Sequence, residues 1–342
     1  MKAMVLREFN TPLIFDETVE KPKPGSNEVL IQVKACGICR TDLKISKGLY
    51  SPGVSLPHVL GHEFSGIVEQ IGSDVQGIKV GQAVVAYFYV TCGRCRYCLS
   101  GEENVCPDMV RPGFERFGGF AEYVTMPASS VVPLGDGVSF EEAAVLPDAV
   151  AVPYHAINRL GKVQRGENVL IVGVGGLGVH AIQIARVLGA HAIASDIDDG
   201  RLAVARKLGA VEAINARRND KIDQIKQVTD GHGVDLCIDL VGTPASFDWA
   251  VQAMGRGGRY VVVGYAPNQP LRVDTIPLHL YEWRIIGCRG STKQDLQDVV
   301  DLTGQGLIKP VIDKVYPLEN ANEGLRDLES GSILGRGVVQ IS

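Results

Sequence analysis

A glycine-rich turn between an apolar strand and a helix constrains the fold of this chain most strongly. Residues 170–178 read Leu-Ile-Val-Gly-Val-Gly-Gly-Leu-Gly, which is a strand that runs into G-x-G-x-x-G and then into a helical pattern. Further strand and helix patterns alternate between about residues 165 and 285, with strands expected at 168–172, 191–195, 234–240 and 259–264 and helices at 178–188, 201–208 and 246–254. That alternation is typical of an α/β fold with a doubly wound parallel sheet.

The glycines of this turn have the spacing that a bound dinucleotide requires. Gly173 makes the tight turn, Gly175 lets the backbone approach a pyrophosphate, and Gly178 allows the helix to pack closely on the strand. Gly176 and Leu177 complete the turn, and the helix N-terminus offers free N–H groups to the phosphates. The alternative is a structural turn in an unrelated α/β sheet.

An acidic residue follows at the distance expected for ribose recognition. Asp196 stands eighteen residues after Gly178, at the end of the next predicted strand. Its carboxylate can accept both ribose hydroxyls of an adenosine, and its charge, with Asp198 and Asp199, repels a 2′-phosphate. We therefore expect NAD rather than NADP, although Arg201 nearby could partly offset the repulsion.

The first 140 residues differ in pattern from this region. Short strand-like runs at residues 29–33, 66–72 and 81–87 are bounded by glycine and turn residues, without helical patterns between them. They predict an antiparallel, barrel-like domain. A strand-like tail at residues 337–341 is expected to return to it, so that the chain of 342 residues holds about two domains.

Composition excludes two classes of partner. The formal net charge of −5 offers no basic surface for a phosphate backbone, so we expect no nucleic acid. No run reaches about 18 charge-free apolar residues, and the N-terminus lacks the apolar segment of a signal peptide, so we expect no membrane partner and a cytoplasmic location.

Four of the eight cysteines lie within fifteen residues. They are Cys92, Cys95, Cys98 and Cys106. Four thiolates at this spacing can surround zinc as a tetrahedron, and a site filled by four cysteines has no position left for a substrate, so the predicted site is structural. A redox-active thiol cluster and a pair of disulfides are the alternatives, and a reducing compartment disfavours both.

A second cluster has the donors of an open metal site. Cys36 and Cys39 precede Gly61-His62-Glu63, and one thiolate, one imidazole and a carboxylate would leave room for an exchangeable ligand. From the residues alone, these side chains could equally be core residues, a redox pair or a zinc knuckle.

With these motifs in this order, the sequence resembles the zinc-containing medium-chain alcohol dehydrogenases over nearly its whole length. The matching segments are residues 37–42, 61–63, 72–81, the four-cysteine lobe and residues 173–178. The resemblance implies a GroES-like β-barrel catalytic domain at residues 1–148 and 289–342, with the zinc lobe at about 90–108. It also implies a Rossmann NAD-binding domain at residues 149–288.

The resemblance also implies roles for individual side chains at the open site. Cys39, rather than Cys36, and His62 would bind a catalytic zinc, with Glu63 as a neighbouring carboxylate that can bind or exchange. Asp42 would orient His62, and Arg40 would reach the cofactor pyrophosphate.

The position where many members carry another cysteine ligand is Asp148 here. Polyol-dehydrogenase relatives have Glu at this position and some secondary-alcohol dehydrogenases have Asp. Asp148 either binds the zinc, directly or through water, or only caps the helix that follows.

The remaining implied residues concern the proton and the nicotinamide. Thr41 would be the first proton carrier, and Lys44 stands where many relatives have a histidine that passes the proton to solvent. Val263 and Arg289 lie in segments expected near the carboxamide, and Phe88 matches a position that lines the substrate pocket or simply packs in a strand.

The resemblance thus implies a zinc-dependent alcohol dehydrogenase with NAD and two zinc ions per chain, acting on a small primary or secondary alcohol to give an aldehyde or ketone. Two alternatives remain, a polyol or sugar dehydrogenase of the same family and a non-catalytic protein that binds zinc and a nucleotide. A homodimer or homotetramer is expected by resemblance only.

Overall fold

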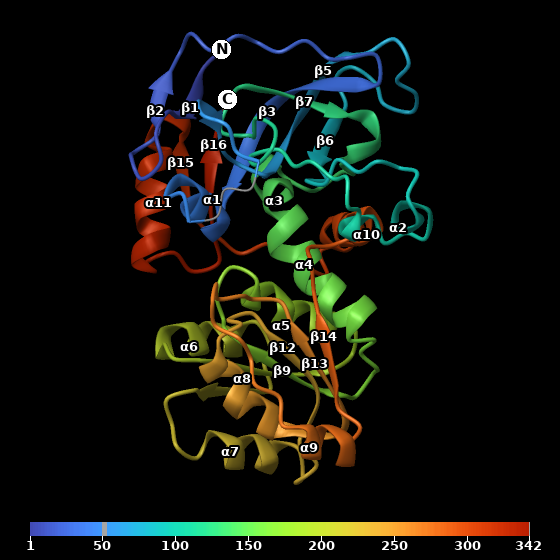
Figure 1. Ribbon diagram of the computed structural model, residues 1–342, viewed down its shortest axis with the longest axis vertical. Helices are drawn as coiled ribbons and strands as arrows, with labels where there is room; N and C mark the ends of the chain where they lie inside the picture. The colour runs from blue at the N-terminus through green and yellow to red at the C-terminus, as the bar shows by residue number, and fades with distance from the viewer. Residues whose placement is uncertain (50–52, 342) are drawn as a thin grey trace. The chain divides into compact units, whose positions relative to one another are not determined.

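The computed structural model describes residues 1–49 and 53–341, and the chain divides into two compact units. Unit 1 comprises Met1–Asp148, Thr292–Gly306 and the segment from Pro310 onward. Unit 2 comprises Ala149–Ser291 and Leu307–Lys309. Each unit has its own sheets and its own apolar core (Figure 1).

Unit 1 is built on a seven-stranded sheet with the order β15-β16-β3-β5-β6-β8, in which β7 also pairs with β3. All of these pairs are antiparallel except that of β15 with β16. Its strands are β3 (Glu28–Ile38), β5 (Glu63–Ile71), β6 (Ala83–Ala86), β7 (Tyr123–Pro127), β8 (Val131–Pro133), β15 (Ile312–Pro317) and β16 (Arg336–Gln340).

A smaller sheet and several short helices complete unit 1. The sheet has the order β2-β1-β4, with bounds Ile14–Asp16, Ala3–Leu6 and His58–Val59. The helices are α1 (Arg40–Ser46), α2 (Arg96–Leu99), α3 (Phe140–Val145), α10 (Lys293–Gly304) and α11 (Ala321–Ser330). The mostly antiparallel sheets confirm the barrel-like, strand-rich class expected for this part of the chain.

Unit 2 contains a six-stranded sheet in which every strand pair is parallel. Its order is β11-β10-β9-β12-β13-β14, so the chain moves outward from β9 in one direction and then from β12 in the other. The strands are β9 (Asn168–Val172), β10 (His191–Asp196), β11 (Glu212–Asn215), β12 (Val234–Asp239), β13 (Met254–Val262) and β14 (Arg284–Gly287). This order confirms the doubly wound fold. In such folds ligands bind where the strand order reverses, and the order reverses here between β9 and β12.

Helices connect the strands of this sheet, as parallel pairing requires. They are α5 (Gly178–Val187), α6 (Asp199–Lys207), α7 (Lys221–Val228), α8 (Pro244–Ala250) and α9 (Thr275–Leu280) (Figure 1). The strands β11 and β14 and the helices α7 and α9 were not among the elements expected from the sequence. In the part of the chain that the structure describes, no helix is long and apolar enough to cross a membrane.

A helical run from Phe140 to Leu160 begins in unit 1 and ends in unit 2. It starts at α3, whose N-cap Ser139 accepts a hydrogen bond from the backbone of Glu142. Two π-helical stretches, Leu146–Val150 and His155–Leu160, lie on either side of α4 (Ala151–Tyr154). Pro147 lacks the N–H that a regular helix would use, which favours such an irregular turn, and π-helical turns are frequent at functional sites.

Candidate functional site

Cys39 and Asp42 are held in place by the start of helix α1. Cys39 is the N-cap, and its Sγ accepts the N–H of Thr41 at 3.5 Å. In return, Asp42 Oδ2 accepts the N–H of Cys39 at 2.9 Å, which completes a capping box. The thiol and the carboxylate are therefore both oriented by local backbone geometry.

His62 and Glu63 lie at the beginning of β5, beside this helix start. His62 Nδ1 is 3.3 Å from Asp42 Oδ1, and the same oxygen accepts the N–H of Gly61 at 3.3 Å. Gly61 has φ of +92°, and a Cβ there would lie 2.7 Å from Cys36 Sγ, so only glycine fits. Asp42 thus contacts both the Cys39 and the His62 segments.

Aromatic rings enclose the imidazole of His62. Phe88 and Phe114 lie with their ring centroids 5.5 and 5.4 Å from it. Phe88 is 5% exposed and Phe114 is 4% exposed. The guanidinium of Arg111 covers the Phe114 ring at 3.9 Å from its centroid. These contacts restrict how the imidazole can rotate.

Asp148 lies within the π-helical stretch and does not cap a helix. The N-cap of α4 is Val150, which makes no side-chain cap bond, so the capping role that the sequence allowed is not observed. Instead Asp148 Oδ2 pairs with Arg336 and lies 3.4 Å from Cys39 Sγ. Arg336 Nη2 also lies 3.0 Å from Glu63 Oε1.

The structure brings together four potential metal ligands. Donor atoms of Cys39, His62, Glu63 and Asp148 all lie within 4.8 Å of one another. Both carboxylate oxygens of Glu63 and Nδ1 of His62 are buried and make no hydrogen bond within the described residues, although Arg336 and Asp42 lie at ion-pair distance from Glu63 Oε1 and His62 Nδ1. Mixed sulfur, nitrogen and oxygen donors suit zinc, and the incompletely paired oxygens indicate that a cation fits here.

The buried groups of this cluster disturb one another's ionisation. Burial raises the pKa of Cys39, as does Asp148, while Arg336 lowers it. Burial also raises the pKa of Glu63 to about 8, against the lowering effect of Arg336. For His62, burial lowers the pKa, but Asp42 and Cys39 raise it well above the usual value. A divalent cation would offset the clustered negative charge and displace these protons.

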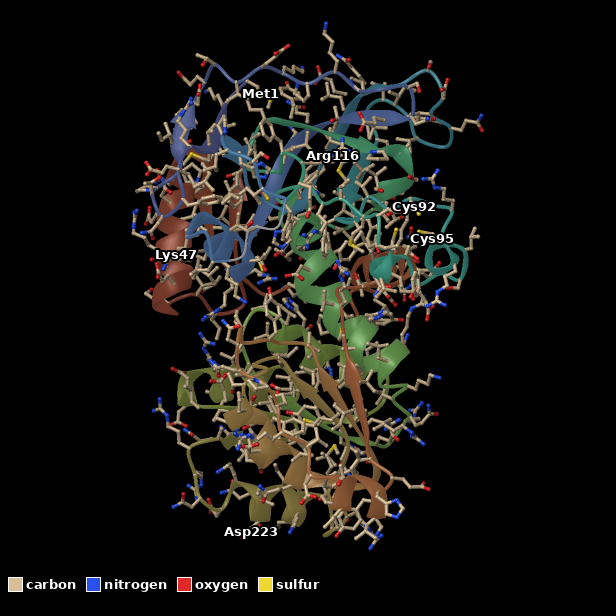
Figure 2. The ribbon with its side chains drawn as sticks, viewed as in Figure 1. Met1, Lys47, Cys92, Cys95, Arg116 and Asp223 are labelled. Carbon is tan, nitrogen blue, oxygen red and sulfur yellow. The ribbon has the colours of Figure 1, made fainter. Side chains whose placement is uncertain are left out.

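The four-cysteine lobe forms a second cluster in unit 1. The sulfurs of Cys92, Cys95, Cys98 and Cys106 lie within 4.8 Å of one another, and Figure 2 shows the labelled Cys92 and Cys95 side by side. Cys98 Sγ is 3.9 Å from Cys92 Sγ and 3.5 Å from Cys95 Sγ. These separations exclude disulfides, and they are close to the roughly 3.8 Å between sulfurs around a tetrahedral zinc.

Four residues near the predicted open site lie outside the donor cluster and differ in their burial. Thr41 and Lys44 lie on α1 and are half-buried, and burial lowers the pKa of Lys44. Arg40, at the first position of this helix, is exposed. Cys36 is fully buried on β3 opposite Phe64 and is not part of the donor cluster.

In unit 2, the glycine turn joins β9 to α5. Gly173 has φ of +97°, and its N–H donates to the carbonyl of Ser195 on β10 at 2.8 Å. Gly178 is the first residue of α5, and a Cβ there would lie 2.0 Å from the Gly173 carbonyl oxygen. Gly175, Gly176 and Leu177 complete the turn, and Leu177 is the N-cap of the helix.

Asp196 ends β10 and contacts this turn. Its Oδ2 accepts the N–H of Val174 at 2.7 Å, and its Oδ1 accepts those of Ile197 and Asp198. Arg201 also approaches the turn, because its Nη1 lies 3.5 Å from the position of a Cβ on Gly175. The acidic residue and the cation both lie beside the proposed phosphate-binding turn.

Val263 and Arg289 follow β13 and β14. The N–H of Val263 donates to the carbonyl of Asp239, at the end of β12, at 2.9 Å. Arg289 is exposed and follows β14 by two residues. Val263 thus lies at the carboxyl edge of the sheet, where a doubly wound fold binds its ligand.

Sequence reasoning missed Arg336 and Phe114. Arg336 lies on β16, 188 residues from Asp148, and no motif surrounds it. A buried arginine within an otherwise apolar tail strand was the available signal, since arginine is rarely buried without a partner. Phe114 lies in a loop without periodic pattern, so nothing in its surroundings indicated a contact with His62.

Comparison with known proteins identifies the family. Residues 25–136 match the alcohol dehydrogenase GroES-like domain, and residues 176–305 match the zinc-binding dehydrogenase domain. An alcohol dehydrogenase of Geobacillus stearothermophilus is 38% identical, with all of both chains covered. The chain belongs to the zinc-containing medium-chain dehydrogenase family.

Other members of this dehydrogenase family have related names and structures. The acryloyl-coenzyme A reductase of Sulfurisphaera tokodaii is 34% identical, with 95% of each chain covered. A solved NAD-dependent alcohol dehydrogenase is 34% identical and superposes with a TM-score of 0.93, with 100% of both chains covered. The family therefore makes this chain a dehydrogenase, and so an oxidoreductase.

Replacing Arg336 with Met should destabilise unit 1 mainly when no cation is bound. The substitution leaves the buried carboxylate of Glu63 and the half-buried carboxylate of Asp148 without their cation, and breaking a buried pair typically costs about 3–5 kcal/mol. We expect a marked fall in Tm of the metal-depleted protein in calorimetry and a smaller fall after zinc is added. Arg326→Met on the exposed face of α11 is the matched control. If Arg336→Met lowers Tm equally with and without zinc, Arg336 does not compensate the same carboxylates that a bound cation would.

Proposed function

We propose that this dehydrogenase oxidises a small primary or secondary alcohol to an aldehyde or ketone with NAD, and that it holds one catalytic and one structural zinc. The observation that carries the proposal is the convergence of Cys39, His62, Glu63 and Asp148 beside incompletely paired carboxylate oxygens. The names of the relatives support the reaction type.

The two zinc ions would have different ligands and different tasks. Cys39, His62 and Asp148, with Glu63 as an exchanging carboxylate, would hold the catalytic ion and leave a position for the alcohol. Cys92, Cys95, Cys98 and Cys106 would hold the structural ion and fold the lobe around it. When bound, zinc would supply Lewis-acid chemistry at the alcohol oxygen, and NAD would supply a hydride acceptor for the carbon.

Protein side chains perform the remaining steps. Asp42 orients His62 through its 3.3 Å contact with Nδ1. The Thr41 hydroxyl takes the proton of the alcohol and passes it on, and Lys44, which is also half-buried, lies one turn later on the same helix. Phe88 and Phe114 beside His62 keep the surroundings apolar, which favours small alcohols without phosphate or carboxylate groups.

NAD would bind at the carboxyl edge of the parallel sheet in unit 2. The N–H groups at the start of α5 and the turn formed by Gly173, Gly175, Gly176, Leu177 and Gly178 would bind the pyrophosphate, with Arg40 as an additional cation. Asp196 would accept the adenosine ribose hydroxyls, and Arg201 lies beside Gly175 of the same turn. Val263 and Arg289 would lie near the carboxamide.

We also propose a homo-oligomer, dimer or tetramer, formed through the free edge of the six-stranded sheet. Among the residues that the structure describes, β14 pairs with β13 and with no other strand, so its other edge is available for pairing. The segment before it exposes large apolar side chains, with Val273 at 43%, Ile276 at 66% and Leu280 at 59% exposure. A second copy of the chain would cover this surface.

A turnover screen tests the proposed reaction. We expect NADH absorbance to rise when the protein and NAD are given primary or secondary alcohols, and to rise more slowly with polyols and aldoses or with NADP. The reverse reaction should consume NADH with aldehydes or ketones. If turnover is confined to polyols or aldoses, the protein is a polyol or sugar dehydrogenase of the same family. Reduction of an acryloyl thioester alone, or no turnover on any alcohol, would contradict the proposal.

Metal content separates the two sites. We expect two zinc ions per chain in the wild type and one in each of Cys39→Ser and Cys92→Ser, measured by elemental analysis. Cys39→Ser should lose turnover and keep most of its thermal stability. Cys92→Ser should lower Tm, because the lobe loses the ion around which it folds. Cys288→Ser, in unit 2, should retain both ions. If the wild type contains only one zinc ion, only the structural site binds metal, and the proposal of a catalytic zinc is wrong.

The contribution of Asp148 can be measured separately. Asp148→Asn removes the charge and a strong oxygen donor, so we expect zinc affinity and turnover to fall by at least about 10-fold. The exposed Asp136→Asn in the same unit should change neither quantity. If Asp148→Asn retains full zinc content and turnover, Asp148 serves only as the ion-pair partner of Arg336.

A further inference from the structure

A fully buried carboxylate, that of Asp239, lies at the carboxyl end of β12 and has no role in the function proposed above. Asp239 is 0% exposed and accepts four hydrogen bonds with its side chain. Its Oδ1 accepts the N–H groups of Val241 at 2.9 Å and Gly242 at 3.0 Å. Its Oδ2 accepts the hydroxyls of Tyr260 at 2.8 Å and Ser246 at 3.0 Å.

Through these bonds Asp239 holds two loops at the carboxyl edge of the sheet. The side chain fixes the turn between β12 and α8, and the backbone carbonyl accepts the N–H groups of Val263 and Gly264 after β13. The two loops touch, because a Cβ on Gly242 would lie 1.9 Å from the carbonyl oxygen of Gly264.

The same turn also contacts the glycine-rich turn. The Cγ2 atom of Val241 lies 3.0 Å from the position of a Cβ on Gly173, and Cδ1 of Leu240 lies 3.4 Å from that of Gly178. The turn after β12 therefore lies against the glycine-rich turn, at the point where the strand order reverses and where doubly wound folds bind their ligands.

Stability alone does not explain a charged residue at this place. In the described part of the chain no lysine, arginine or histidine pairs with Asp239, so only hydroxyl and amide dipoles compensate its buried charge. Burying a carboxylate in this way is costly, and well-packed apolar residues usually stabilise a core at least as well. The carboxylate instead fixes the turn after β12 relative to α8 and β13, because four donors from these segments converge on its two oxygens.

We infer that Asp239 is a positioning residue for the cofactor, which sets the loops that receive the nicotinamide half of NAD. The glycine turn and Asp196 would take the phosphates and the adenosine ribose, so the loops after β12 and β13 remain for the other half of the dinucleotide. This inference rests on the proposed function, because it requires that unit 2 binds NAD. Asp239 touches no reacting atom, and it acts through the turn after β12 and through Val263 and Gly264.

The opposite end of the same strand offers a matched control. Asp235, near the start of β12, accepts the N–H of Asn168 with its Oδ2 at 2.8 Å. It also fixes backbone by a side-chain hydrogen bond, but at the edge of the sheet away from the crevice. A merely structural role for Asp239 predicts that alanine at either position lowers Tm without changing NADH affinity.

The test measures NADH affinity by nucleotide fluorescence, together with Tm, zinc content and the KM for the alcohol. We expect Asp239→Ala to weaken NADH binding about 10-fold or more, with zinc content unchanged and the alcohol KM within about twofold of wild type. Asp239→Asn should restore most of the NADH affinity. The amide oxygen still accepts the two backbone N–H groups, and the amide NH2 can donate to the hydroxyl oxygens of Ser246 and Tyr260. Asp235→Ala should bind NADH like the wild type.

The outcomes distinguish this inference from the proposed function. If the wild type does not bind NADH, the proposed function is wrong and the inference falls with it. If the wild type binds NADH and Asp239→Ala binds it equally well, only the inference is wrong. Should Asp239→Ala fail to fold, Tyr260→Phe decides, since it keeps the ring that packs on Phe247 and removes one donor. We expect about threefold weaker NADH binding for it, and unchanged affinity would overturn the inference.

Discussion

The structure of unit 1 depends on one buried cation, Arg336, that offsets a cluster of buried acids. Glu63 and Asp148 both lie against its guanidinium, and Cys39 and Asp42 lie close by. Without a compensating charge, so many acidic groups would be expensive to remove from water. Arg336 is 4% exposed, so the compensation occurs inside the protein and not through solvent.

Strand pairing explains how these groups meet although they are far apart in sequence. The end of β3 leads directly into Cys39, its Gly37 pairs with Glu63 on β5, and its Ile38 pairs with Gly337 on β16. Thiol, carboxylate and guanidinium are therefore positioned by neighbouring strands of one sheet. The C-terminal strand has to return to this sheet, because it carries the cation.

The sequence allowed prediction of those parts of the site whose geometry is local. The four-cysteine lobe and the glycine turn each lie within a short segment, so residue spacing reveals the chemistry before the fold is known. The alternation of strands and helices likewise predicted the parallel sheet, although β11, α7, α9 and β14 were missed. The pattern at β14 is short, and α9 begins after a run of exposed turn residues, so neither had the periodicity on which such predictions depend.

Non-local features could not be read in this way. Asp148 follows a proline, which predicts a helix cap as readily as a ligand, and only its position opposite Arg336 shows that it is not a cap. Asp239 looks like the polar end of a buried strand, and its four donors come from α8, β13 and the adjoining turn.

The two buried acid systems are compensated in different ways, and the difference matters for function. In unit 1 a long, flexible arginine contacts two carboxylates at once, so either one can leave it for a cation while the other keeps a charged partner. In unit 2 the hydroxyls of Ser246 and Tyr260 and two backbone N–H groups all donate to Asp239, so its two oxygens are fully engaged within the fold. The first arrangement would suit the exchanging metal ligand that we propose for unit 1, and the second would suit the loops that we propose to position a dinucleotide in unit 2.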